Sequence, residues 1–457
     1  MKKRLSTLLL ASLVLVSVAA GCNDSNHQND TQTKSEFQSG NKVIYHNGTC
    51  LYDISDPDHP VFVEQEKAAD NDNFNIPKCV VLEYGKCVIS GNEAIGYYLD
   101  NYDTLCHYDL TDVSKCKLTE VDYKDAMEKA VKAKLGADAE SETIEQLKYS
   151  SPYMQDWCEG EDGNIYFWYV CPPETFQTYP EMNYLLGRMS KDCQSIEFIG
   201  EDVNACSFAL GNGYIYYADN GYLYTGQNET APDKDKAGIY KMKTDGSQKE
   251  KLVSVRPSDD AAMSYNSLST VTGRVEIVGD NLYYIAQDGS KETYLYRLPL
   301  SGGTPEKVTD ESVCDYFIDS ASDTLYFWDG SLNSISPDGC ALYSMPVSGG
   351  EKKPLFQKLS ARTGLGLSVN GNYLYISDGD KFTGYNIRRS SDFSDIPCGQ
   401  RYELSTGKFE YLDCYAEAKV SVDELCIQKI ESVGAMTISW NEYKDRPENE
   451  KGVKVYA

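Results

Sequence analysis

The sequence predicts an all-β protein, a β-propeller of about seven blades, with six and eight blades as the alternatives. The first observation is a module of short aromatic runs between turns, clearest over 280–308, where runs at 282–285 and 294–298 flank a turn at 287–290. The second is its recurrence, because the first strong Tyr of successive units falls at 45, 97, 166, 216, 283, 326 and 375. Steps of this size fit roughly four strands in each unit, with insertions in the longer units.

Composition supports half-buried strands. The 457 residues include 36 Tyr against 13 Phe and 4 Trp, and Tyr packs its ring while its hydroxyl reaches water or a partner. Small antiparallel sheets leave exposed edges, and radial closure of the sheets protects them. We expect the strands near Val43 and near Val455 to share one blade and so lock the ring.

The first segment, 1–21, has the pattern of an export signal. Three basic residues precede an apolar run at 5–18, and the small residues at 19–21 lead directly to Cys22. It resembles a bacterial lipoprotein signal peptide, with 19–22 as the lipobox. The resemblance implies lipidation of Cys22 and anchoring to the outer face of the cytoplasmic membrane. The alternatives are a plain secretory signal and a short anchor helix, for which the apolar run is too short.

Two further segments differ from the repeat. Residues 22–41 hold the expected lipidated Cys22 and a polar stretch that predicts a flexible tether. The propeller then occupies 42–457. Within it, 122–149 predicts a small helical insertion, because apolar residues from Tyr123 to Leu135 recur at helical spacing. Asp122 is the expected N-cap and Gly136 the expected end, with a second short helix near 144–147.

Net charge limits the classes of partner. The formal charge is −27, from 43 basic and 70 acidic residues. This balance argues against binding to nucleic acid or to anionic lipid, because both require positive charge on the protein. It favours cations or basic partners, or simply a soluble acidic coat on an exported protein. We expect a monomer whose partners are the membrane, through its lipid, and a protein or glycan ligand.

Three phrases carry a resemblance to a known family: IYKMKTDGSQKEKL at 239–252, LYRLPLSGGTPEKVT at 295–309 and LYSMPVSGGEKKPL at 342–355. They resemble the repeats of bacterial DUF5050-type domains, which are similar to TolB-like and YWTD-like six-bladed propellers. The resemblance is strongest over 210–415 and absent from 122–150. It implies a propeller on the surface of a Gram-positive bacterium. The shared motifs are structural, so no functional residue is transferred by it.

The cysteines permit disulfides in an exported protein. There are 15, and 14 remain if Cys22 is lipidated. The plausible short-range pairs include Cys106 with Cys116, Cys158 with Cys171, Cys193 with Cys206, and Cys398 with Cys414. Spacing alone does not establish connectivity, and buried reduced cysteines are the alternative. No CxxC pair occurs, which argues against zinc.

The candidate ligand-binding residues are Trp157, Trp168, Trp328 and Asp162, because carboxylates beside aromatic rings suit sugars. The competing interpretation makes the Asp a turn residue and the rings interior packing. We expect no cofactor, with calcium in a loop as the weaker alternative, since the acidic runs at 70–73 and 233–235 do not complete a calcium loop. The sequence also contains neither a G-x-S-x-G elbow nor any His beyond 107, so no catalytic residue is assigned.

These observations favour a non-enzymatic binding module, in which loops at one mouth of a rigid propeller hold a peptide, a glycan or an envelope protein. A propeller-type glycan-processing enzyme is the main alternative, and an acidic, aromatic central site would favour it. A scaffold in an envelope complex is the third hypothesis, and an exposed apolar patch would favour that one.

Overall fold

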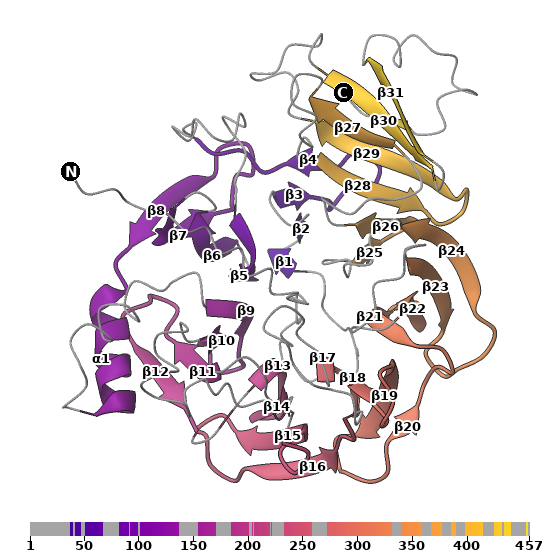
Figure 1. Cartoon of the computed structure of the whole chain (residues 1–457). Coiled ribbons are helices and arrows are strands. Elements are labelled where there is room, and N and C mark those ends of the chain that lie inside the picture. The colour runs from indigo at the N-terminus through magenta and orange to yellow at the C-terminus, as the bar shows by residue number, and fades with distance from the viewer. Residues whose placement is uncertain are drawn as a thin grey trace, which may run out of the picture.

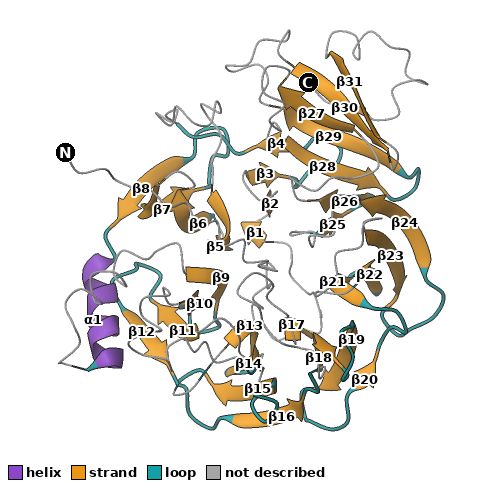
Figure 2. Cartoon of the chain, viewed as in Figure 1, coloured by secondary structure: helices purple, strands orange, loops and turns teal. Residues whose placement is uncertain are grey.

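The structure is a computed structural model. It describes residues 37–39, 42–46, 51–66, 82–90, 92–98, 101–136, 154–170, 184–200, 203, 205–219, 221, 233–257, 272–330, 340–358, 367–376, 385–389, 398–414, 425–431, 434–439 and 454–455. Most of these residues lie in short strands, and one α-helix accompanies them (Figure 2). The cysteine expected to carry lipid, Cys22, lies outside the described residues.

Seven small sheets surround a central axis as the blades of a β-propeller, which confirms the predicted fold (Figure 1). Each blade contains a four-stranded antiparallel meander that begins near the axis and ends at the rim. Blades 1 and 2 contain β1 (Phe37–Ser39), β2 (Lys42–His46), β3 (Leu51–Asp53), β4 (Val61–Phe62), β5 (Leu82–Ser90), β6 (Glu93–Tyr98), β7 (Asn101–Asp109) and β8 (Lys117–Val121). Blades 3 and 4 contain β9 (Met154–Glu159), β10 (Ile165–Val170), β11 (Tyr184–Met189), β12 (Ile196–Ile199), β13 (Ala205–Gly211), β14 (Tyr214–Asp219), β15 (Gly238–Lys243) and β16 (Glu250–Ser254).

The remaining blades follow the same order. Blades 5 and 6 contain β17 (Thr272–Val278), β18 (Asn281–Gln287), β19 (Thr293–Pro299), β20 (Glu306–Lys307), β21 (Val313–Asp319), β22 (Thr324–Asp329), β23 (Cys340–Pro346) and β24 (Lys353–Lys358). Blade 7 contains β25 (Ser368–Asn370), β26 (Tyr373–Ile376), β28 (Cys398–Glu403), β29 (Lys408–Cys414) and β32 (Lys454–Val455). Three further strands form a separate sheet beside blade 7: β27 (Tyr385–Arg389), β30 (Leu425–Glu431) and β31 (Gly434–Ser439).

The core lies between the blades. Successive residues of a strand point to opposite faces, so each blade contributes to the hydrophobic clusters on both sides of it. In β18, for example, Leu282 and Tyr284 pack against blade 4, whereas Tyr283 and Ile285 pack against blade 6. This explains why the aromatic runs have no polar face, because both faces of each small sheet are covered.

The ring closes in a different way from the one expected. β2 belongs to blade 1, but β32 pairs in parallel with β29 in blade 7, so the two ends do not share a blade. Instead, blade 1 packs on blade 7, and Tyr45 lies 5.3 Å from Tyr375 between ring centroids. The Asn370 side chain also donates to the carbonyl of Ile54 at 2.6 Å. Side-chain packing therefore replaces strand sharing at this junction.

The helical insertion is confirmed in its first part by α1 (Lys124–Leu135). Gly136 ends the helix at φ 93° as expected, and the cap position is Tyr123. The predicted cap, Asp122, still accepts a hydrogen bond from the backbone N–H of Lys124 at 3.1 Å. The second helix, near 144–147, lies outside the described residues. Along the described part of the chain, no helix is long and apolar enough to cross a membrane.

Candidate functional site

The innermost strands of blades 3 to 6 share a break in their pairing. The register shifts opposite β10, β14, β18 and β22, so each of β9, β13, β17 and β21 carries a bulge. A bulge re-aims the side chains beside it and is common next to functional sites. The residues at these breaks include Asp156, Ser207, Arg274 and Asp315, all of which are buried. We call Asp156, Arg274, Glu276 and Asp315 the inner cluster.

Arg274 is the centre of the inner cluster. Its side chain is 7% exposed and reaches from β17 to blade 6, where Nη1 lies 3.4 Å from Oδ1 of Asp315 and donates to the carbonyl of Tyr316. Its Nη2 lies 3.4 Å from Oε2 of Glu276 on its own strand. The guanidinium also stacks on the Tyr316 ring, 4.8 Å from the centroid. Arg274 therefore joins two blades and orients both carboxylates.

Asp156 contributes a carboxylate from blade 3. Its Oδ2 accepts a hydrogen bond from Nε1 of Trp168 at 2.5 Å, whereas Oδ1 has no hydrogen-bond partner among the described residues. Burial raises the pKa of Asp156 to about 7, although the Trp168 hydrogen bond and the charge of Arg274 act in the opposite direction. Its backbone has φ 49°, a conformation that is uncommon for a residue with a side chain.

The inner cluster holds more negative than positive groups. Three carboxylates accompany one guanidinium, and burial raises the pKa of Glu276 despite the nearby charge of Arg274. Oε2 of Glu276 is buried and makes no hydrogen bond within the described part of the chain. An uncharged hydrogen bond joins blade 4 to blade 5 beside the inner cluster, since Oγ of Ser207 accepts from the N–H of Val275 at 3.1 Å. The arrangement can accept hydrogen bonds or hold a positive group.

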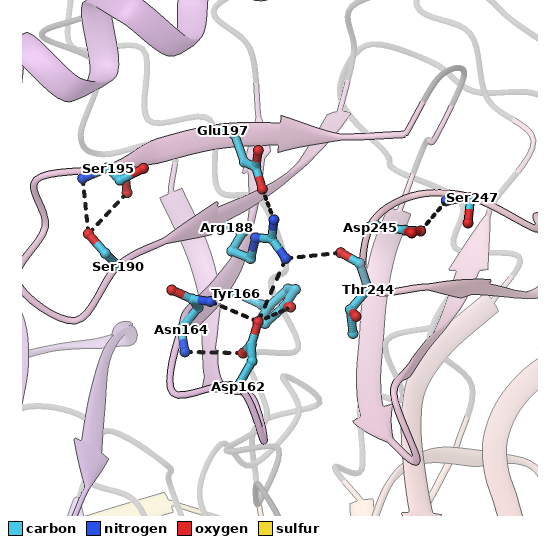
Figure 3. Close-up of polar contacts among 10 residues, drawn as sticks. All are labelled: Asp162, Asn164, Tyr166, Arg188, Ser190, Ser195, Glu197, Thr244, Asp245 and Ser247. Carbon is cyan, nitrogen blue, oxygen red and sulfur yellow. Dashed lines mark hydrogen bonds and ion pairs between the residues drawn. The ribbon is translucent and has the colours of Figure 1, made fainter.

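Asp162 lies elsewhere, in the turn between β9 and β10. Its carboxylate accepts from the Asn164 side chain at 2.8 Å and from the Tyr166 hydroxyl at 2.9 Å, and lies 3.6 Å from Nη1 of Arg188 (Figure 3). Partial burial raises the pKa of Asp162, but these hydrogen bonds and the charge of Arg188 outweigh burial and keep it below its ordinary value. Asp162 is thus fully engaged in the fold. We call Asp162, Asn164, Tyr166, Arg188 and Glu197 the outer network.

The outer network connects blade 3 to blade 4. Arg188 bonds to Glu197 on the neighbouring strand and donates to the carbonyl of Thr244 at 3.4 Å, in the turn between β15 and β16 (Figure 3). That turn needs Gly246, because a Cβ there would lie 2.7 Å from the N atom of Gly200. These contacts explain the position of Asp162 without a ligand.

The three tryptophans expected on a binding face are interior residues, which corrects that expectation. Trp157 is 3% exposed, Trp168 2% and Trp328 0%. Trp157 meets Tyr97 edge-on, with centroids 5.4 Å apart, and Trp328 meets Phe356 at 5.6 Å. All three occupy interfaces between blades, because strand alternation turns their rings into the clusters that hold the ring together.

The first of the four expected disulfide pairs is absent from the structure. Cys106 and Cys116 are both free, which corrects their expected bridge. Cys106 lies opposite Glu120, so Cys116 is about 13 Å further along the strand, beyond the roughly 7 Å that a disulfide spans between Cα atoms. Burial raises the pKa of both thiols to about 12.

Cys193 is also free, and its Sγ lies 3.8 Å from the carbonyl of Lys191. This corrects the expected pair with Cys206, which belongs to blade 4, whereas Cys193 packs between blades 2 and 3. Cys158 is disulfide-bonded, and its expected partner Cys171 lies outside the described residues. Cys398 and Cys414 face each other in the register of β28 and β29, as the expected pair requires of their backbones.

The acidic runs considered for calcium have local roles where the structure describes them. Oδ1 of Asp233 accepts from the N–H of Asp235 at 2.9 Å and closes a turn. The run at 70–73 lies outside the described residues. Across the described ranges, no group of three or more His, Cys, Asp or Glu side chains is placed to hold a metal ion.

Comparison with known proteins finds only distant similarity to solved structures. No family model and no curated protein matches the chain. The oligogalacturonate lyase of Vibrio parahaemolyticus has 11% identity and a TM-score of 0.42, with 80% of this chain and 89% of that chain covered. A puromycin-hydrolysing peptidase of Mycobacterium tuberculosis has 11% identity, a TM-score of 0.45 and coverage of 87% and 54%. TolB of Acinetobacter baumannii has 12% identity, a TM-score of 0.33 and coverage of 77% and 75%.

At these TM-scores and identities, the similarities say nothing about the activity of this chain. The blade number rests on the chain's own sheets.

Proposed function

We propose that the chain is a surface lipoprotein, anchored through Cys22 to the outer face of the cytoplasmic membrane, whose propeller is a non-enzymatic binding module. Its ligand is a peptide, a glycan or an envelope protein. The observation that supports this most is the inner cluster, because Asp156, Arg274, Glu276 and Asp315 belong to the bulged innermost strands of three blades, β9, β17 and β21 (Figure 1). Groups from separate blades make a rigid recognition site.

A ligand screen tests the binding role. The full-length protein in detergent micelles is screened on a glycan array and in pull-downs, in parallel with Asp315→Asn. The expected result is a defined ligand retained by the wild type and lost by the variant. Asp162→Asn, in the outer network, is the matched control and should retain the ligand. Equal retention by all three proteins, or no ligand at all, would overturn the proposal.

One observation favours a second candidate, a glycan-processing enzyme. Asp156 has a pKa of about 7, and Asp315 forms an ion pair with Arg274, so the inner cluster offers a protonated acid together with a paired carboxylate. Such a division of roles is typical of glycosidases. Release of reducing sugar from a bound glycan, abolished in Asp156→Asn with binding retained, would establish this function. Binding without release at any pH from 5 to 8 would exclude it for that glycan.

A further inference from the structure

Blade 7 contains two cysteines that the strand register places directly opposite each other. Cys398 begins β28 and Cys414 ends β29, and the two residues are Cα partners in the antiparallel ladder. Such partners lie about 4.5 or 5.5 Å apart between Cα atoms and occupy the same face of the sheet. A disulfide spans roughly 4.4–6.8 Å between Cα atoms. The backbone therefore holds both residues where a disulfide can form without moving either strand.

No other pair of cysteines in the described strands stands directly opposite in the register. Cys87 and Cys106 come nearest to doing so, because each is the Cα partner of Gly96 on the strand between them. Two strand spacings amount to about 9.6 Å, which exceeds the reach of a disulfide. The register thus singles out the pair in blade 7.

The strands of this pair also carry contacts that close the ring. Arg401 of β28 is buried and donates from Nη1 to the carbonyl of Pro57 in blade 1. Leu412 of β29 is 1% exposed and packs in the hydrophobic cluster that joins blade 7 to blade 1. The two blades share none of the described strands. Side chains on the β28–β29 hairpin therefore help to hold a junction that has no backbone pairing.

The two cysteines stand at the open end of this hairpin. Its closed end is the turn at 404–407, and the chain enters at Cys398 and leaves at Cys414. The three-stranded sheet beside blade 7 is connected through this open end, because β27 precedes Cys398, β30 follows Cys414, and β27 pairs with β30 (Figure 1). A bond between the two cysteines would fasten the hairpin at the end where its strands can separate.

We propose that Cys398 and Cys414 form a disulfide that fastens the β28–β29 hairpin and thereby stabilises the closure of the ring. Each thiol gives up its proton and the two sulfur atoms form one bond. An external disulfide accepts the two electrons and two protons as its own S–S bond breaks into two thiols. A thiol–disulfide oxidoreductase outside the cytoplasm is the class of oxidant required. The inference rests on the proposed surface location only for that oxidant, and oxidised glutathione replaces it in vitro.

Peptide mapping of the full-length protein in detergent micelles tests the bond. The protein is denatured and alkylated without reductant, with or without earlier exposure to oxidised glutathione. Trypsin then places Cys398 in the peptide 390–401 and Cys414 in 409–419, and neither peptide contains a second cysteine. We expect one cross-linked species of these two peptides, which dithiothreitol separates.

The outcomes separate this inference from the proposed function. A cross-link that forms only after exposure to oxidised glutathione would support the bond and count against the external location. Alkylation of both Cys398 and Cys414 after that exposure, or a link from either to a different cysteine, would overturn the inference. Neither of those two results bears on ligand binding, which the ligand screen tests separately.

Hydrogen exchange tests the effect of the bond on the ring. The double variant Cys398→Ser, Cys414→Ser lacks the crosslink, so amides of β28 and β29 should exchange about 10- to 100-fold faster than in the oxidised wild type. Amides of β18 and β19 in blade 5 are the internal reference and should not change. Dithiothreitol should accelerate exchange in β28 and β29 of the wild type but not of the double variant, which is the matched control. Equal exchange in the two proteins would overturn the stabilising role.

Discussion

Asp156 and Asp162 belong to the same blade and lie six residues apart, yet the fold gives them opposite properties. Asp156 lies on the innermost strand, is 9% exposed and has its pKa raised to about 7. Asp162 lies in a turn, holds an Asn, a Tyr and an Arg around its carboxylate, and has its pKa lowered. The difference shows that position along a propeller strand, rather than residue type or nearby tryptophans, decides whether the pKa of a carboxylate is raised or lowered.

The largest expected effect is the loss of stability when Arg274 of the inner cluster is replaced, compared with the loss when Arg188 of the outer network is replaced. Arg274→Met leaves Asp315 and Glu276 buried without their counter-charge, so we expect a loss of about 3–5 kcal/mol in the free energy of unfolding. Arg188→Met, in the half-exposed outer network, should cost under about 1 kcal/mol. Urea unfolding of both variants at pH 7 measures the difference. Equal losses would mean that the inner cluster is no more dependent on its cation than the outer network.

Asp156→Asn tests the raised pKa. Because the folded pKa is about 7 and the ordinary value is 3.8, the folded state keeps a proton that the unfolded state releases. Wild-type stability should therefore fall as pH rises from about 4 to about 7, by up to about 4 kcal/mol, and Asn removes this dependence. The measurement is the difference in unfolding free energy between variant and wild type at pH 5, 6, 7 and 8.

Asp162→Asn is the control, because the stability that this carboxylate contributes should change with pH in the opposite direction. A lowered pKa adds stability above the ordinary pKa and loses it as pH falls, so this variant should be less stable than the wild type at neutral pH and approach it in acid. If the two variants followed the same pH course, the contrast between the inner and outer carboxylates would not hold.

The smallest effect concerns the hydrogen bond that Asp156 accepts from Trp168. Trp168→Phe keeps most of the packing between blades 3 and 4 but removes the Nε1 donor. We expect a loss of about 2 kcal/mol above pH 7, where Asp156 is ionised, and a smaller loss at pH 5. The same pH series of unfolding measurements gives the result. A loss independent of pH would assign Trp168 a packing role alone.

In blade 5 the middle strands could be predicted from the sequence, whereas the innermost strand, β17, was missed. β18 and β19 were recognised from their runs of Leu, Tyr and Ile, because apolar residues on both faces mark a fully covered strand. β17 escaped notice because Arg274 and Glu276 interrupt its apolar residues, although these two alternate with Val275 and Ile277 at the period of a strand. That alternation, directly before the turn at 279–280, was the pattern in the sequence from which β17 could have been predicted. The candidate site lies on the strands that looked least like strands.

By itself the sequence determined the class of fold, the repeat, the blade number within one and the start of the helical insertion, because these depend on local pattern and turn chemistry. Tertiary structure decided how the ring closes, which cysteines remain free and which carboxylates come together. Those outcomes depend on register between strands and on contacts between blades, and Arg274 and Asp315, which pair across two blades, are 41 positions apart in the chain. Their contact depends on how neighbouring blades pack, which no local pattern of residues contains.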